Sequence, residues 1–242
     1  MSIENLLKDL RKTIKLPENI GNWKNIFLSY QTEEDYSRNG LELDRPLKST
    51  PNFTINAIAF DPINGAIIDP FGGIPDLKKR LIRAVGNPEQ RFAEDGLCAM
   101  IAIRLISTLG FDIEEKTELA ISDQLLKNVP KEQIRDELIK ILAGKYRAKA
   151  LEIAWDTGLL TSILPHNVNW PNAIEDFSSL DDPLTLLAAL LHEIEADEVS
   201  RYLDNLKFTI KDKDHVLSLH KNISFLKLRL HNPVTGADNE DS

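Results

Sequence analysis

The chain contains one pair of aspartates at the spacing with which two carboxylates can share a divalent cation, Asp212-Lys213-Asp214. No glycine-rich loop lies near this pair, so we interpret it as surface charge. Leu191-His192-Glu193 has no second histidine or aspartate cluster nearby, which predicts a structural histidine rather than a metal ligand. The remaining histidines, at positions 166, 215, 220 and 231, show no ligand spacing. We therefore predict no metal-binding residues in this chain.

Cys98 is the only cysteine, and no side chain with the chemistry of a catalytic partner can be assigned to it. We interpret it as a small residue of the core or of a cleft. Gly72-Gly73 is typical of a turn that requires positive φ rather than of a phosphate-binding loop. Asp181-Asp182 precedes Pro183 and indicates charge at a helix N-terminus. These patterns predict no catalytic residue.

Composition places the chain among globular proteins of a reducing compartment. Its 242 residues suffice for one large domain or two or three small ones, and its apolar fraction of 42% is ordinary. A single cysteine excludes an internal disulfide, and no apolar run reaches the roughly 18 residues that span a bilayer. We expect a cytoplasmic protein without a membrane partner.

The net charge of −9 argues against diffuse nucleic-acid binding but leaves a local basic track open. Three clusters of basic residues are candidates, although each is interpreted first as a solvated helix face. They comprise Lys78, Lys79, Arg80 and Arg83; Lys140, Lys145, Arg147 and Lys149; and Lys207, Lys211, Lys213, Lys221, Lys227 and Arg229. We interpret Trp23, Trp155 and Trp170 as packing residues.

The hydrophobic pattern predicts an α+β fold that is mostly α. Two strands, 53–60 and 66–73, are expected to pair through an Asn-Gly turn, with a further short strand at 81–86. From residue 88 the period becomes helical. Helices are predicted at 4–14, 88–109, 114–126, 129–142, 147–157, 183–195, 196–203 and 211–228.

Several segments in one order resemble the tRNA nucleotidyltransferase and poly(A) polymerase family, which includes the bacterial class II CCA-adding enzymes. They are Phe53-Thr54-Ile55-Asn56-Ala57, Ile68-Asp69-Pro70-Phe71-Gly72-Gly73, Arg91-Phe92 with Glu94-Asp95, and Leu109-Gly110-Phe111. Ile134-Arg135-Asp136-Glu137-Leu138 and Gly158-Leu159-Leu160 are similar to the helices that follow in that family.

The resemblance implies a small β-containing head, a helical neck that reads the incoming base, and a helical body that holds the tRNA. We accordingly divide the chain into an N-terminal helix and leader (1–22), a partial head (23–86), a neck (87–145), a body (146–232) and a disordered acidic tail (233–242). The family uses Mg²⁺ with ATP and CTP to add nucleotides to RNA 3′ ends, with loss of pyrophosphate.

The substrate-facing positions depart from the family pattern. Residues 1–52 contain neither the Gly-Gly segment nor the Asp-x-Asp pair that the family carries before Phe53, and Thr50-Pro51-Asn52 replaces Arg-Arg-Asp. In the neck, Cys98 and Ile101 replace two arginines of Glu-Asp-x-Leu-Arg-x-Leu-Arg-Ala-x-Arg. Asp95 and Arg104 remain as the candidate nucleotide-binding remnant.

This selective pattern indicates an N-terminally truncated, degenerate family member, with an incomplete gene model as the rival explanation. The first hypothesis is a protein that is inactive alone, needs no cofactor, and binds tRNA, another structured RNA, or a protein. The second is a working CCA-adding or poly(A)-adding enzyme whose Gly-Gly and Asp-x-Asp segment comes from a second chain that completes the head. The third is a protein-binding helical scaffold.

Overall fold

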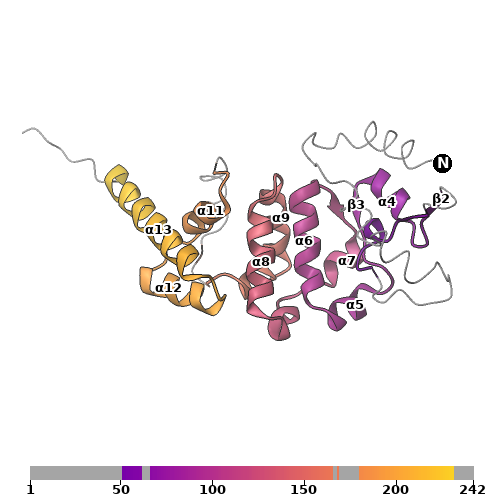
Figure 1. Ribbon diagram of the computed structural model, residues 1–242, viewed down its shortest axis with the longest axis horizontal. Helices are drawn as coiled ribbons and strands as arrows, with labels where there is room; N and C mark the ends of the chain where they lie inside the picture. Colours follow the sequence, from indigo (N-terminus) through magenta and orange to yellow (C-terminus); the bar gives the residue numbers. More distant parts are fainter. Residues whose placement is uncertain (1–50, 62–65, 166–167, 169–179, 232–242) are drawn as a thin grey trace, which may run out of the picture.

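A computed structural model describes residues 51–61, 66–165, 168 and 180–231. In these ranges the elements follow one another along an elongated molecule, from β1, β2 and α4 at one end to α12 and α13 at the other (Figure 1). The structure is mostly helical with small sheets, as predicted. The predicted helix at 4–14, Trp23, Trp170, the head up to residue 50 and the acidic tail lie outside the described residues. No described helix combines the length and apolarity needed to cross a membrane.

The predicted hairpin is present but shorter than expected. Strands β1 (Ala59–Asp61) and β2 (Ala66–Ile68) pair antiparallel, with Ala59 opposite Ile68. The strand predicted from residue 53 is wrong over its first half, because Thr54–Asn56 forms the 3₁₀ helix η1. The Ala57 amide donates to the Thr54 carbonyl, which closes this turn in place of a strand ladder.

Helix α4 (Gly73–Lys79) begins at the predicted glycine turn. Gly72 has φ +74°, whereas Gly73 is required for close approach, since a Cβ there would lie 2.1 Å from the Thr54 carbonyl oxygen. Asp69 accepts hydrogen bonds from the amides of Gly73 and Ile74 at 2.6 and 2.9 Å. The family-like Asp69–Gly73 segment therefore caps a helix that packs on η1.

A second small sheet joins the head to the helices. Strand β3 (Leu81–Ile82) pairs in parallel with β4 (Asp112–Ile113), and Phe53 bridges to Ala84. The strand predicted at 81–86 thus covers only two residues. Strand β4 was not predicted, because two residues give no period by which a strand could be recognised.

The single helix predicted over 88–109 is wrong, because the chain forms two helices, α5 (Pro88–Glu94) and α6 (Leu97–Leu109). Asp95 between them is extended, with φ −143° and ψ 96°. At Gly96 a Cβ would lie 2.0 Å from the Leu125 carbonyl oxygen. Gly96, which would weaken a continuous helix, is instead the N-cap of α6. Because it has no side chain, the backbone at Leu125 can pack closely against it.

The helix predicted over 114–126 is likewise divided, into α7 (Glu115–Leu119) and the 3₁₀ helix η2 (Asp123–Asn128). The predicted helices at 129–142 and 147–157 are confirmed as α8 (Lys131–Leu142), which begins two residues later than predicted, and α9 (Arg147–Asp156). Gly158, with φ +76°, follows α9, and the 3₁₀ helix η3 (Leu160–Ser162) comes next.

Helices α11 (Pro183–Leu190), α12 (Ala196–Asn205) and α13 (Ile210–His231) form the far end of the molecule. The helix predicted over 183–195 ends earlier, at Leu190. His220 of α13 is buried, and its Nε2 lies 3.0 and 2.9 Å from the carbonyl oxygens of Leu191 and Ile194. This contact joins α13 to the end of α11.

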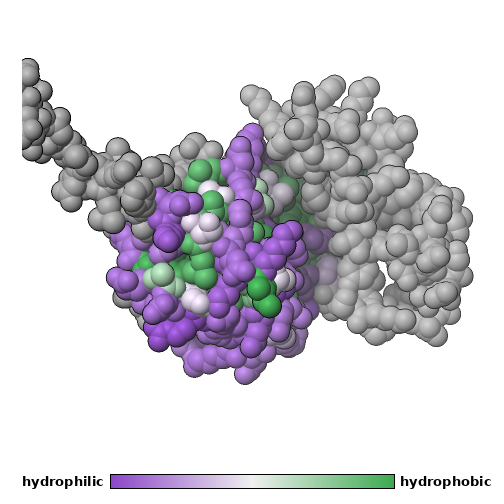
Figure 2. Space-filling model, turned by 60° about the vertical axis from the view of Figure 1, so that its left-hand side comes forward, coloured by the Kyte–Doolittle hydropathy of each residue, from purple (hydrophilic) through white to green (hydrophobic). Residues whose placement is uncertain are grey.

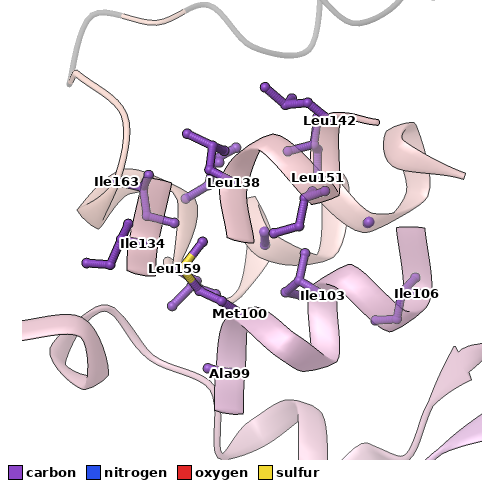
Figure 3. Close-up of a cluster of buried hydrophobic side chains, with 14 of the residues drawn as sticks. Ala99, Met100, Ile103, Ile106, Ile134, Leu138, Leu142, Leu151, Leu159 and Ile163 are labelled. Carbon is purple, nitrogen blue, oxygen red and sulfur yellow. The ribbon is translucent and has the colours of Figure 1, made fainter. Parts of the chain in front are cut away.

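The core is centred on α6, which packs against both α8 and α9 (Figures 1 and 3). Helices α6 and α8 run parallel, since Arg104 contacts Glu137 and the Ser107 hydroxyl donates to the Ile141 carbonyl one turn further on. Figure 3 shows the side chains that interdigitate there: Ala99, Met100, Ile103, Ile106, Ile134, Leu138, Leu142, Leu151, Leu159 and Ile163. All ten are buried.

Candidate functional site

Only one narrow stripe of α6 reaches the surface. Leu97, Ile101, Arg104 and Thr108 are partly exposed, and the other residues of the helix are buried. Their spacing of four, three and four residues places them on a single helix face. This stripe lies between α5 and α8 and contains one of the two predicted nucleotide-binding residues, together with one of the two positions where arginine has been replaced.

Asp95 is exposed just before this stripe. Its Oδ1 accepts a hydrogen bond from the Leu97 amide at 3.1 Å, and its Oδ2 lies 3.4 Å from Cys98 Sγ. The carboxylate therefore caps the first turn of α6. Cys98 itself is fully buried, as predicted. Burial, with the nearby Asp95 charge, raises the pKa of the Cys98 thiol to about 12.

Arg104 lies in a three-residue ion-pair network with α8. Its Nε donates to Glu137 Oε2 at 2.6 Å, and Lys140 Nζ donates to Glu137 Oε1 at 2.8 Å. The Glu137 side chain is 9% exposed, whereas those of Arg104 and Lys140 are 29% and 56% exposed. A nearly buried carboxylate thus holds two cations that both reach solvent. No functional role was assigned to Glu137 from the sequence, although the segment that contains it, Ile134–Leu138, resembles the family.

Asp95 and Arg104 do not lie together. Asp95 lies before α6, and the rise of that helix from Leu97 to Arg104 alone is roughly 10 Å. Asp95 pairs with the start of α6, and Arg104 pairs with Glu137. A nucleotide role for the two residues stays a prediction, and it requires a ligand long enough to contact both.

A second polar network, also missed in the sequence, connects the head to the neck. Buried Asp76 accepts from the Thr54 hydroxyl at 2.8 Å and from Arg83 Nε at 3.0 Å. Arg83 also donates to Glu114 at 2.8 Å, and Glu114 in turn accepts from Thr117. Thr54, Asp76 and Arg83 lie in or beside segments that resemble the family, but the sequence gives no sign that they contact one another, and only their hydrogen bonds in the structure reveal the connection.

Most of the described basic residues of the three clusters have partners within the molecule. Lys149 pairs with Asp112, Lys213 with Asp204, and the Arg147 guanidinium donates to the Leu180 carbonyl. Arg80 lies over the Phe111 ring and Lys145 over that of Tyr146. The side chains of Lys227 and Arg229 are outside the described set. The interpretation of these clusters as solvated helix faces stays a prediction, and these contacts show that several of their side chains are also held by partners within the molecule.

Other predictions concern single residues. His192 is structural, since its Nδ1 lies 2.7 Å from the Ala189 carbonyl oxygen. Asp182 is the N-cap of α11, and its hydrogen bond from Thr185 lowers the pKa of its carboxyl. Asp212 accepts from the Thr209 hydroxyl at the start of α13. Trp155 departs from the packing prediction because it is 39% exposed.

Comparison with known proteins places two family segments on this fold. Residues 32–83 match the family described as "Poly A polymerase head domain", and residues 110–169 match "Probable RNA and SrmB- binding site of polymerase A". The CCA-adding enzyme of Lactobacillus helveticus (strain DPC 4571) is 39% identical over 173 residues, covering 68% of this chain and 43% of that enzyme.

The chain belongs to the tRNA nucleotidyltransferase and poly(A) polymerase family. Over 110 residues it is 51% identical to the CCA-adding enzyme of Lactobacillus johnsonii (strain CNCM I-12250 / La1 / NCC 533), covering 45% of this chain and 27% of that enzyme. The chain thus spans less than half the length of these two family members.

Solved structures of the family agree in fold. The Bacillus stearothermophilus CCA-adding enzyme in complex with CTP has a TM-score of 0.62 and 33% identity, covering 72% of this chain and 46% of that one. A tRNA nucleotidyltransferase complexed with a primer tRNA and an incoming ATP analogue has a TM-score of 0.59 at 22% identity. The match covers 75% of this chain and 59% of the tRNA nucleotidyltransferase, and at this identity it supports only a common fold.

The metal ions of the family have no fitting ligand set among the described residues. No group of three or more His, Cys, Asp or Glu side chains in that part of the chain is placed to hold a metal ion. Two carboxylates of the described head are already engaged, with Asp69 capping α4 and Asp76 paired with Arg83. No catalytic step through a metal is therefore assigned to these residues.

Proposed function

We propose that this chain is an RNA-binding protein of the CCA-adding enzyme family that does not add nucleotides on its own. The observation that carries the proposal is the match of residues 110–169 to the family's RNA-binding region, of which residues 112–162 form the elements from β4 to η3 that pack against α6. The relatives it matches are CCA-adding enzymes, so the 3′ region of tRNA is the RNA we propose.

The proposed lack of activity rests on the α6 positions that depart from the family pattern. An arginine at 98 would offer five donors to a base or phosphate, whereas Cys98 is a buried and protonated thiol. Ile101 offers none. Loss of both arginines would remove donors to base and phosphate while leaving the packing intact.

Nucleotide addition is tested by incubating the pure protein with tRNA that lacks its 3′ end, labelled CTP or ATP, and magnesium. We expect no incorporation, and incorporation by this chain alone would refute the proposed inactivity. A parallel reaction should include a second protein that carries the Gly-Gly and Asp-x-Asp segment. Incorporation only in that mixture would support the alternative in which another chain completes the head.

RNA binding is tested by titrating labelled tRNA at several salt concentrations. We expect affinity to fall with salt, with a logarithmic slope of about 0.7–0.9 for each phosphate contacted. Absence of salt-dependent binding would refute the RNA-binding proposal and favour a protein-binding scaffold. The surface seen in Figure 2 is mostly hydrophilic with separate small apolar areas, as suits a soluble RNA-binding module more than an obligate hydrophobic interface.

A further inference from the structure

We propose that Arg104 and Lys140 form a clamp for one phosphate of the bound RNA, and that Glu137 is the residue that positions both cations. This inference rests on the proposed RNA binding. It assigns a ligand class, the phosphodiester backbone, to a pair of side chains on two helices, α6 and α8.

The donor inventory of the two cations is the first support. Glu137 takes only the Nε hydrogen of Arg104 and one hydrogen of Lys140. A guanidinium has five N–H donors and an ammonium three, so most donors remain available beside this carboxylate. The two terminal nitrogens of an arginine held at Nε suit the paired oxygens of a phosphate.

Exposure is the second support. The glutamate side chain is 9% exposed, and the cations are three and six times more so, at 29% and 56%. A phosphate that approaches from solvent therefore meets the cations and not the carboxylate. Glu137 lies behind them and keeps two like charges side by side that would otherwise repel each other.

Other described basic side chains of α8 and α9 have partners of a different kind. Arg135 pairs with Asp136 and donates to the Lys207 carbonyl, and Lys149 pairs with Asp112. Those contacts join the basic groups to exposed acids or to the backbone. A phosphate would have to compete with these partners for the same basic group. Arg104 and Lys140 differ because they share a single carboxylate that is itself shielded.

The clamp predicts that removal of one negative charge, at Glu137, weakens the binding of tRNA. Glu137→Gln makes the protein less acidic, which by long-range electrostatics alone should strengthen binding to a polyanion. We expect the opposite, a loss of tRNA affinity of about tenfold, because the cations lose the group that orients them. Glu132→Gln is the matched control, since Glu132 is an exposed residue of the same helix and its loss changes the net charge equally.

The experiment measures tRNA binding by fluorescence anisotropy across salt concentrations, with a thermal melt of each variant to confirm folding. Arg104→Gln and Lys140→Gln should each weaken tRNA binding, and the double variant should lower the salt slope by about 0.7–0.9, the value for one phosphate, whereas Lys131→Gln, at the partly exposed start of α8, should not match them. Equal affinities for the Glu137→Gln and Glu132→Gln proteins would overturn the clamp. A wild-type protein that does not bind tRNA would instead overturn the proposed function, and the clamp with it.

Discussion

Cys98 has the chemistry of a core residue at a position where the family carries an arginine. It is fully buried, and its thiol stays protonated well above the ordinary pKa of cysteine. The folded protein therefore keeps this proton between about pH 9 and 12, where the unfolded chain releases it. The free energy of unfolding should fall as the pH rises through this range, because the unfolded state binds fewer protons there.

The same burial predicts slow chemical modification. At pH 8 a thiol with a pKa near 12 has roughly a thousandfold less thiolate than one near 9, and the greater nucleophilicity of a high-pKa thiolate offsets only part of this, so a thiol reagent should react more than about tenfold more slowly with the folded protein than with the chain in urea. Cys98 is the only cysteine, which makes the signal unambiguous. Rapid labelling of the folded protein would show that position 98 is open to solvent and ligand.

Tyr202 carries a polar group without a partner. Its hydroxyl is buried and has no hydrogen-bond partner among the residues that the structure describes, and burial raises the pKa of the phenol. Because an unsatisfied buried hydroxyl costs about 1–3 kcal/mol, Tyr202→Phe should raise the free energy of unfolding by about 1 kcal/mol. Urea denaturation measures this. The control is Tyr146→Phe, at a partly exposed ring, which should change stability by less than about 0.5 kcal/mol. A less stable Tyr202→Phe protein would contradict the absence of a partner.

At the scale of elements, the contact between α6 and η2 explains why the chain has a glycine at position 96. Gly96 has φ −62°, which alanine adopts easily, so the backbone alone would favour Gly96→Ala. The added Cβ would, however, lie 2.0 Å from the Leu125 carbonyl oxygen, and a backbone atom cannot rotate away. Gly96→Ala should therefore destabilise the protein by about 1–3 kcal/mol, as overpacking does.

Gly86→Ala is the matched control for this substitution. Nothing lies within 4 Å of its added Cβ, but φ is +78°, so its cost of about 1–2 kcal/mol comes from the backbone alone. Chemical denaturation of both variants, with a structure of Gly96→Ala, separates the two causes. An unchanged position of η2 together with unchanged stability would show that the contact is not tight.

Elements with a long hydrophobic period were predictable from the sequence, and those set by tertiary contacts were not. Helices α8 and α9 were placed within two residues, since their apolar positions repeat over several turns. The break at Asp95-Gly96 depends on Leu125, thirty residues away, and no local pattern encodes it. In the site, Arg104 was found through resemblance, whereas Glu137 required the packing of α8 on α6.

For the whole molecule, the polar network from Thr54 to Thr117 determines how the head segment is held on the helices. Besides this network, Thr54 and Val85 donate backbone hydrogen bonds to Arg83 and Asn52, and β3 pairs with β4. Asp76 is the buried centre of the network, with two donors on one carboxylate oxygen. If an RNA or a second chain contacts both head and neck, this connection sets their relative position.

Asp76→Ala should therefore release the head segment before the helices unfold. The substitution leaves the Thr54 hydroxyl and the inner face of Arg83 without an acceptor, for an expected loss of about 3 kcal/mol. Amide hydrogen exchange should show residues 53–84 losing protection while α8, α9 and α11 keep theirs. The control is Asp123→Ala, which removes an exposed aspartate and should cost less than about 0.5 kcal/mol. Uniform loss of protection over all helices would mean that head and neck unfold as one unit. Asp76 would then stabilise the entire fold rather than the contact between head and neck.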